Sequence, residues 1–259
     1  MSGANSEFNT DADEPIIHRS FLVALRLERE KVANFKEYPF CIPAVRHLKE
    51  LTFHPGVTFF IGENGAGKST LLEAMALKLG FNPEGGGKNF HFATRETHSS
   101  LHQFIRLERG ISRPTDNFFL RAESFYNLAS EIEKLGVESS YGDKPLHGQS
   151  HGEAFLALLV HRLRGNGLYL FDEPEAALSP QRQLSVLPLI HRLVQQQSQL
   201  VIATHSPILL AYPKARIYQF SEDGLAAVKY TDTPHYQITR DFLNRHERML
   251  SLLLSDEDR

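Results

Sequence analysis

The feature that most constrains this chain is a glycine-rich loop between a strand pattern and a helix pattern. Residues 62–69 read GENGAGKS and match G-x-x-x-x-G-K-S/T at every fixed position. The apolar, β-branched and aromatic run Val57–Ile61 precedes the loop and predicts a buried strand. Residues 70–79 favour a helix, which Gly80 is expected to end. A phosphate-binding loop needs this order of strand, loop and helix.

The composition of the loop predicts a site for a nucleoside triphosphate. Glycines let backbone N–H groups approach phosphate oxygens, and the helix N-terminus adds a partial positive charge. Lys68 is expected to reach the β- and γ-phosphates, and the Ser69 hydroxyl to ligate Mg²⁺. A flexible glycine turn without a ligand is the alternative interpretation. The predicted nucleotide contacts in this stretch are Gly62, Glu63, Asn64, Gly65, Ala66, Gly67, Lys68, Ser69 and Thr70.

Length and composition limit the remaining possibilities. A chain of 259 residues can bury a substantial core. Its 28 Lys+Arg against 31 Asp+Glu give a net charge of −3, which offers nucleic acid or an anionic membrane no overall attraction. One cysteine, Cys41, forms no internal disulfide and favours a reducing cytoplasm. No apolar run approaches the roughly 18 residues of a membrane span, so a membrane role would need a partner.

Two further strand patterns end in residues that suit phosphate chemistry. Leu168–Phe171 runs into Asp172 and Glu173, and Leu200–Thr204 ends at His205. Asp172, at the carboxyl end of a strand, is expected to hold Mg²⁺ together with the loop serine. Glu173 is expected to polarise the attacking water, and His205 to contact the γ-phosphate. A single histidine at a strand end is more often structural, so His205 gains its role only from the set.

The motifs occur in a family-like order. After the loop come Ser150-x-Gly152-Glu153, Asp172-Glu173-Pro174, Ala177-Leu178-Ser179 and Thr204-His205-Ser206. From about residue 20 onward the chain resembles the ABC-type ATPases, above all the small stand-alone cytoplasmic ATPases, often labelled AAA-type, that are related to SMC proteins. The resemblance implies ATP and Mg²⁺ as ligands and a homodimer. In that dimer Ser150, Gly152 and Glu153 of one subunit would cap the ATP held by the loop of the other.

The implied fold class is α/β, a P-loop NTPase of ABC-ATPase type. It comprises a mostly parallel core sheet flanked by helices, an antiparallel β part and a helical lobe. Residues 1–14 are expected to be a disordered tail and 15–259 a single domain. Within that domain we expect a core at about 16–80 and 165–235, a helical or insert lobe at about 81–164 and a C-terminal helix at about 236–254.

Three features depart from the family pattern. His151 adds bulk where the transporter signature has glycine. Residues 120–124 stand where a glutamine is expected but contain none, which leaves Arg121 or Glu123 as its substitute. The short separation of Lys68 from Ser150 leaves no room for the coiled-coil arms of SMC proteins. These features argue against a standard transporter subunit, which stays open as an alternative.

Two other stretches allow two interpretations each, and a third predicts a strand. The aromatics of Tyr38–Pro43 would stack on adenine or pack within a loop. The basic stretch 88–113 would contact nucleic acid or form a solvated face. In Ile16–Glu28, alternation predicts a strand with Phe21 and Val23 on the same, core-facing side.

Two competing functions are weaker. Residues 148–152 match the G-x-S-x-G elbow of serine hydrolases, with Asp172 and His205 following in hydrolase order. The elbow needs a strand before the serine, whereas residues 141–145 are typical of a loop. The second competing function is a binding module that nucleotide switches but that hydrolyses it slowly or not at all. The intact Glu173 argues against this interpretation. The sequence therefore favours an ATP-hydrolysing switch that works with a partner in DNA or RNA maintenance or in phage defence.

Overall fold

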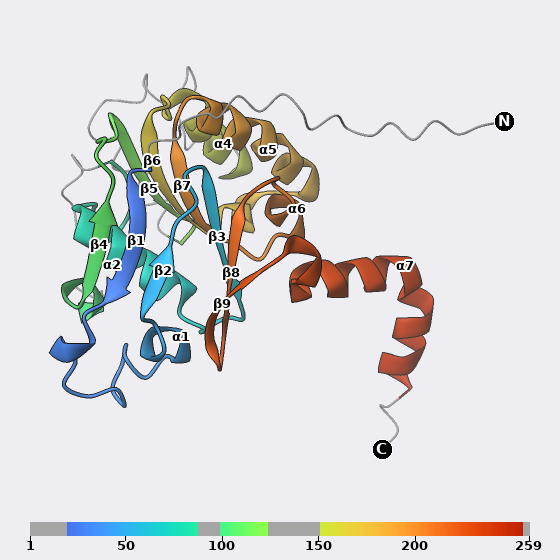
Figure 1. Cartoon of the computed structure of the whole chain (residues 1–259). Coiled ribbons are helices and arrows are strands. Elements are labelled where there is room, and N and C mark those ends of the chain that lie inside the picture. Colours follow the sequence, from blue (N-terminus) through green and yellow to red (C-terminus); the bar gives the residue numbers. More distant parts are fainter. Residues whose placement is uncertain (1–19, 88–98, 124–150, 256–259) are drawn as a thin grey trace, which may run out of the picture.

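The computed structural model describes residues 20–87, 99–123 and 151–255 (Figure 1). The strands are β1 (Leu22–Leu27), β2 (Glu50–Thr52), β3 (Val57–Gly62), β4 (Ile105–Arg109), β5 (Asp116–Arg121), β6 (Gly167–Asp172), β7 (Gln199–Ala203), β8 (Arg216–Ser221) and β9 (Gly224–Val228). The α-helices are α1 (Pro43–Arg46), α2 (Lys68–Leu79), α4 (His151–His161), α5 (Pro180–Gln195), α6 (Pro207–Leu210) and α7 (Pro234–Leu254). Short 3-10 turns are η1 (Arg29–Lys31), η2 (Ser100–Gln103), η5 (Pro174–Ala177) and η6 (Tyr230–Asp232).

Two sheets form the framework. The larger has six strands in the order β5-β6-β7-β3-β8-β9, all pairs parallel except the β8–β9 hairpin. The smaller is an antiparallel sheet in the order β2-β1-β4. The expected α/β class, with a mostly parallel core sheet and an antiparallel part, is therefore confirmed.

Each face of the large sheet covers its own apolar core. On one side α2 lies between the two sheets, and Leu72 and Met75 join residues of β1 and β3 in one cluster. On the other side α4, α5 and α6 cover the sheet, as Figure 1 shows. In β3, Phe60 belongs to the first cluster and Phe59 to the second, as alternation along a strand requires. β3 is thus buried on both faces, which confirms the strand predicted before the loop.

One glutamine joins the two sheets. The side chain of Gln199, at the start of β7, is 1% exposed. Its Oε1 accepts hydrogen bonds from the backbone N–H groups of Phe21 (3.0 Å) and Leu22 (2.8 Å). Its Nε2 donates to the carbonyls of Leu22 (2.8 Å) and His54 (2.9 Å). The amide thereby fixes β1 against the sheet that carries the loop.

Two sequence expectations can be compared with the strands. The stretch 81–164, expected to be a helical or insert lobe, contributes β4 to the small sheet and β5 to the edge of the large one. The division into core, lobe and C-terminal helix stays a prediction. In β1 the pairing with β4 shifts register between Leu22 and Ala24, so Val23 is exposed rather than core-facing.

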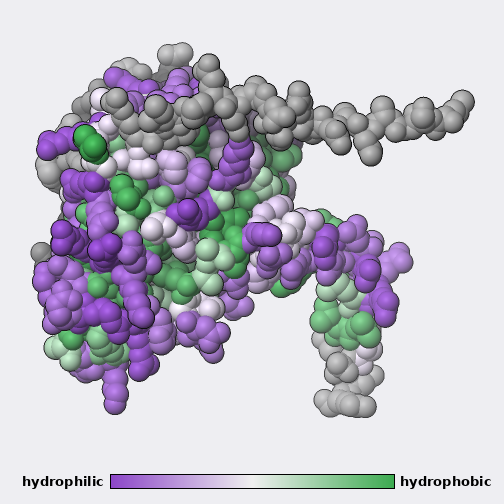
Figure 2. All heavy atoms as spheres, viewed as in Figure 1, coloured by the Kyte–Doolittle hydropathy of each residue, from purple (hydrophilic) through white to green (hydrophobic). Residues whose placement is uncertain are grey.

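Helix α7 projects from the body of the molecule (Figure 1). The Thr233 side chain caps it by accepting a hydrogen bond from Tyr236 N (3.2 Å), and Pro234 occupies its first turn. The backbone leaves helical geometry at Arg245, where Figure 1 shows the bend. Figure 2 shows apolar surface on the segment beyond the bend, where Leu252, Leu253 and Leu254 are exposed. Across the described ranges, no helix combines the length and apolarity needed to cross a bilayer.

Candidate nucleotide site

The predicted site residues converge where parallel strands end. The glycine loop follows β3, Asp172 ends β6, and His205 lies two residues beyond β7. Because these three strands are neighbours and parallel, their carboxyl ends share one edge of the sheet. Gly67 shows how tightly the loop is held: its φ is +98°, and a Cβ there would lie 2.7 Å from Ile42 Cγ2. Glycine is therefore required at this position by both backbone and packing.

Lys68 is directed into the loop itself. Its Nζ donates hydrogen bonds to the carbonyl oxygens of Gly62 (2.8 Å) and Glu63 (3.0 Å). Burial lowers the pKa of Lys68, and the nearby Glu173 and Asp172 carboxylates oppose this shift. A cation is thus positioned behind the backbone N–H groups of the loop, ready for an anionic ligand.

Ser69 and Asp172 meet as predicted. The Ser69 hydroxyl donates a hydrogen bond of 2.9 Å to Asp172 Oδ1. Burial raises the pKa of Asp172 to about 6, opposed by the hydrogen bond from Ser69 and by Arg121. A hydroxyl and one carboxylate fit Mg²⁺, which usually keeps several waters and takes further ligands from substrate phosphates. Within the described ranges, no cluster of three or more His, Cys, Asp or Glu side chains could hold a metal independently of a nucleotide.

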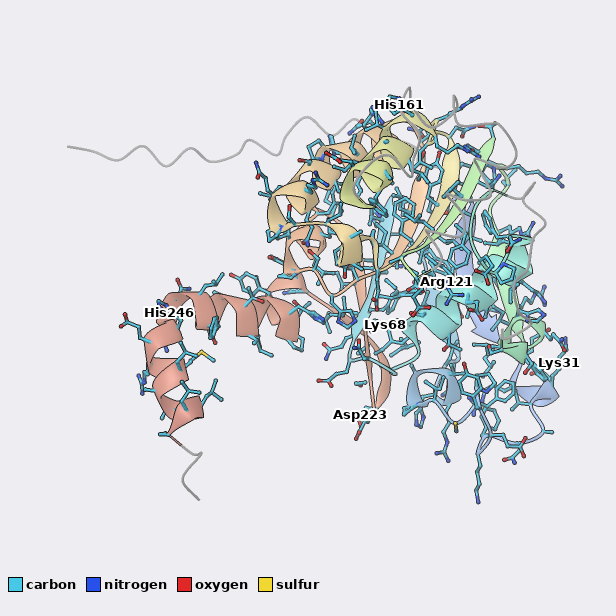
Figure 3. The ribbon with its side chains drawn as sticks, turned by 180° about the vertical axis from the view of Figure 1, so that it is seen from behind. Lys31, Lys68, Arg121, His161, Asp223 and His246 are labelled. Carbon is cyan, nitrogen blue, oxygen red and sulfur yellow. The ribbon has the colours of Figure 1, made fainter. Side chains whose placement is uncertain are left out.

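Arg121 occupies the place of the expected glutamine. It stands opposite Asp172 in the β5–β6 pairing, and its Nε lies 3.9 Å from Asp172 Oδ2. Its Nη1 forms an ion pair of 2.7 Å with Glu73 on α2 and donates to the Pro83 carbonyl at 3.2 Å. Of the two expected substitutes, Glu123 is 87% exposed and lies 3.4 Å from Arg121 Nη2. Figure 3 shows Arg121 and Lys68 at this same edge.

Glu173 and His205 face each other. Glu173 has a left-handed backbone (φ +52°), and its N–H donates 2.9 Å to the Ala203 carbonyl of the neighbouring strand. Non-glycine residues in this conformation concentrate at functional sites. His205 Nε2 lies 3.6 Å from Glu173 Oε1, and the His205 N–H donates to Glu175 Oε1 at 2.5 Å. Burial raises the pKa of Glu175, opposed by that hydrogen bond.

A cavity of about 1080 Å³ opens beside the glycine loop and His205. Its lining comprises Pro43, residues 62–66, His205, residues 219–222, Pro234, His235, Ile238 and Thr239. This arrangement gives little support to the hypothesis that aromatics of Tyr38–Pro43 stack on adenine. Phe40 is buried and packs edge-on against Phe104 with ring centroids 4.8 Å apart, and Tyr38 is 65% exposed. The loop interpretation therefore fits these two aromatics.

The signature residues lie apart from this cavity. Gly152 and Glu153 begin α4 and are absent from the cavity lining. A Cβ on Gly152 would lie 2.8 Å from the Ala177 carbonyl, and Glu153 forms an ion pair of 3.4 Å with Arg182 on α5. Ser150 lies outside the described residues. One copy of the chain thus does not bring the described signature residues to its own loop.

The structure also bears on two other sequence hypotheses, the serine-hydrolase match and the basic stretch 88–113. The serine of the G-x-S-x-G match lies outside the described residues, while Asp172 and His205 contact Ser69 and Glu173. These contacts place the two residues in the nucleotide site rather than in a hydrolase triad. Of the basic stretch, residues 88–98 lie outside the described ranges. Arg106 on β4 is exposed, but acidic side chains of the same small sheet, Glu50 and Glu108, pair with Arg26 at 3.2 Å.

Sequence reasoning missed His235. This residue is in the first turn of α7, and its Nε2 lies 3.3 Å from His205 Nδ1. The available signal was Thr233-Pro234, a cap followed by a first-turn proline, which starts the helix two residues before the expected 236.

Two family models match consecutive parts of the chain. One, described as "AAA domain", matches residues 31–136. The other, described as "AAA domain, putative AbiEii toxin, Type IV TA system", matches residues 145–211. The fold, the ordered site and these matches define the class: the chain is a small P-loop ATPase of ABC type. Both family models are described as AAA domains, and each matches less than half of the chain.

Individual proteins show distant similarity. Ribose import ATP-binding protein RbsA 2 of Escherichia coli O157:H7 is 28% identical over 224 residues, 76% of this chain and 41% of that protein. The chain therefore spans less than half of that relative. L-cystine transport system ATP-binding protein TcyN of E. coli K12 is 27% identical over 235 residues, 78% of this chain and 92% of that protein. The SMC head domain from Thermotoga maritima superposes with a TM-score of 0.45 at 13% identity, over 80% of this chain and 98% of that one.

Proposed function

We propose that this chain is an ATP-binding and ATP-hydrolysing switch that forms a homodimer around two ATP molecules. The observation that carries the proposal is the contact of Ser69 with Asp172, beside Glu173 and His205, at the sheet edge where a cavity opens along the glycine loop and His205. The lysine, hydroxyl, carboxylates and imidazole at this edge are the groups that phosphoryl transfer to water requires.

Each residue has a defined task in this reaction. The N–H groups of the loop and Lys68 bind the β- and γ-phosphates, and Ser69 and Asp172 would hold Mg²⁺, which neutralises phosphate charge when bound. Glu173 orients a water and accepts its proton as the water oxygen bonds to the γ-phosphorus. The bond from that phosphorus to the β,γ-bridging oxygen breaks, and ADP leaves with the electron pair. His205 Nε2 lies beside Glu173 and can donate to a γ-phosphate oxygen.

The separation of the two sets of residues supports the dimer. Ser150 and the start of α4 would offer a hydroxyl and backbone N–H groups to a γ-phosphate. Gly152 and Glu153 do not line the cavity of their own chain, which is consistent with a cap supplied by a second copy.

For the process served, we favour work with a partner in DNA or RNA maintenance or phage defence. The match of residues 145–211 to a family described with a toxin system supports this direction. An ATPase subunit of a transporter is the second candidate, supported by the import proteins among the relatives. Nucleic-acid-stimulated hydrolysis would support the first, and co-purification with a membrane-spanning partner the second.

Glu173→Gln tests the mechanism and the dimer together. The variant keeps the size of the side chain but loses its charge, so hydrolysis should fall by about 100-fold or more. ATP should still bind, because Ser69, Asp172 and Lys68 are unchanged, and the variant with Mg-ATP should elute as a dimer in size-exclusion chromatography with light scattering. Glu247→Gln, on the exposed face of α7, is the matched control. Undiminished hydrolysis would refute the role of Glu173, and a monomer with bound ATP would refute the dimer.

A further inference from the structure

A second histidine lies behind the histidine of the nucleotide site. His235 Nε2 is 3.3 Å from His205 Nδ1, and the ring centroids are 5.4 Å apart at an interplanar angle of 51°. Both residues line the cavity over the glycine loop. His205 thereby lies between Glu173, whose Oε1 is 3.6 Å from Nε2, and His235, at hydrogen-bond distance from Nδ1.

The contacts of His205 determine where its proton must lie. A neutral imidazole has one N–H, and the other nitrogen can only accept. The Glu173 carboxylate and a γ-phosphate oxygen both accept hydrogen bonds, so His205 Nε2 has to be the donor toward either of them. Nδ1 of His205 is then the acceptor and needs an N–H from the neighbouring ring. His235 Nε2 is the group at hydrogen-bond distance that can supply it.

The surroundings of His235 disfavour its charged form and hold the ring in place. Burial lowers the pKa of His235, and the nearby His205 and Lys68 lower it further, against the opposing effect of Glu63. The helix start that carries the ring is anchored: Thr233 is fully buried, and its hydroxyl donates 2.8 Å to the Tyr230 carbonyl.

A second anchor connects this helix start to the segment after His205. The Tyr230 hydroxyl donates a hydrogen bond of 3.0 Å to the carbonyl of Pro207, two residues beyond His205. The position of His235 relative to His205 is therefore fixed from both sides of the contact.

We propose that His235 is a positioning residue for ATP hydrolysis, one that donates its Nε2–H to His205 Nδ1 and so fixes the tautomer in which the His205 Nε2–H points toward Glu173 and the γ-phosphate. This inference rests on the proposed function and adds a residue from α7 to it. His235 acts through His205, so it should influence the rate of the chemical step more than the affinity for ATP.

Side-chain amides provide the kinetic test. In His235→Gln the amide nitrogen lies at about the reach of Nε2 and can donate to His205, whereas the shorter amide of His235→Asn cannot reach. We expect kcat to fall about 5- to 10-fold in His235→Ala and His235→Asn, the effect of losing one hydrogen bond. His235→Gln should stay within about 3-fold of wild type, and the Kd for ATP should stay within about 2-fold in all three. Equal kcat in the Ala and Gln variants would overturn the proposal.

A spectroscopic test needs no hydrolysis. Long-range ¹H–¹⁵N correlation spectra of the imidazoles, assigned with His205→Asn, distinguish the two neutral tautomers from the cation. We expect the Nε2–H tautomer for His205 in the ligand-free wild type and in His235→Gln, and a loss of that preference in His235→Ala. An Nδ1–H or doubly protonated His205 in the wild type, with His235 as the acceptor, would overturn the proposal.

The two proposals fail in different ways. If Glu173→Gln hydrolyses ATP as fast as wild type, the proposed mechanism fails, while the spectra still report on the histidine pair. If Glu173→Gln is inactive but His235→Ala has the wild-type kcat, only the role of His235 is refuted.

Discussion

The P-loop half and the signature half of the proposed composite site differ in how far one chain assembles them. The P-loop half gathers residues from β3, α2, β6 and the end of β7 at a single sheet edge, and Ser69 and Asp172 are already in contact. The signature half lies at the start of α4, where Gly152 packs against Ala177 and Glu153 pairs with Arg182. Parallel strands therefore bring the residues of the P-loop half together within one chain, whereas the proposed cap would depend on a second copy.

The largest effect should come from removing the cation of the P-loop half. Lys68→Ala deletes the charge that faces the β- and γ-phosphates, so ATP affinity should fall by at least about 100-fold. Isothermal titration calorimetry measures this, and circular dichroism checks that the protein stays folded. Lys78→Ala removes an exposed lysine from the same helix and should leave the affinity unchanged. Wild-type affinity in Lys68→Ala would contradict the assignment of the loop.

Damage to the signature half should separate binding from dimerisation. In the Glu173→Gln background, Ser150→Arg would place a bulky cation against the opposing loop and helix N-terminus. The dimer should be lost while ATP stays bound to the monomer, as light scattering and a nucleotide-retention assay would show. Ser251→Arg adds the same charge at an exposed position of α7 and is the control. A dimer that survives Ser150→Arg would place the interface elsewhere.

Arg121, at the position of the expected glutamine, allows a test of stability within the P-loop half. Arg121→Gln restores the family residue but removes the 2.7 Å ion pair with the mostly buried Glu73. The free energy of unfolding should fall by about 2 kcal/mol, because Glu73 loses its partner. Glu123→Gln removes only the exposed partner of Arg121 and should change this quantity by about 0.5 kcal/mol or less. Equal stability of both variants in urea unfolding would show that the Arg121–Glu73 pair contributes nothing.

The smallest effect on basal hydrolysis should come from Arg106 and Arg109 of the basic stretch. With Arg106 and Arg109 both changed to Glu, basal ATP hydrolysis should stay within about 2-fold of wild type, since neither lines the cavity. Any nucleic-acid binding should weaken, and binding by the wild type should decrease steeply with added salt. Fluorescence anisotropy with DNA and RNA at low salt measures it. An absence of binding by the wild type with ATP present would end this hypothesis.

The parts of the fold predicted from sequence are those encoded by short, contiguous patterns. The strand before the loop and the strands ending near Asp172 and His205 carry their own apolar runs. The meeting of Ser69 with Asp172 followed because parallel strands end at one edge.

The parts that were missed depend on residues distant in the chain. β4 reads as a charged stretch, and its pairing partner β1 lies far earlier in the chain. The ion pair of Arg121 with Glu73 joins residues 48 apart, and the contact of His205 with His235 joins residues 30 apart. No local pattern specifies such pairs, because they arise only once the sheet and α7 are in place.

The bend in α7 gives the helix a mechanical property. The straight part before Arg245 is about 16 Å long at about 1.5 Å per residue, so a 10° rotation about its base would move its far end by roughly 3 Å. The base of this arm is at His235, and its outer segment carries the exposed leucines. A small displacement of the imidazole pair would therefore produce a larger displacement of the exposed leucines, in proportion to the length of the helix between them.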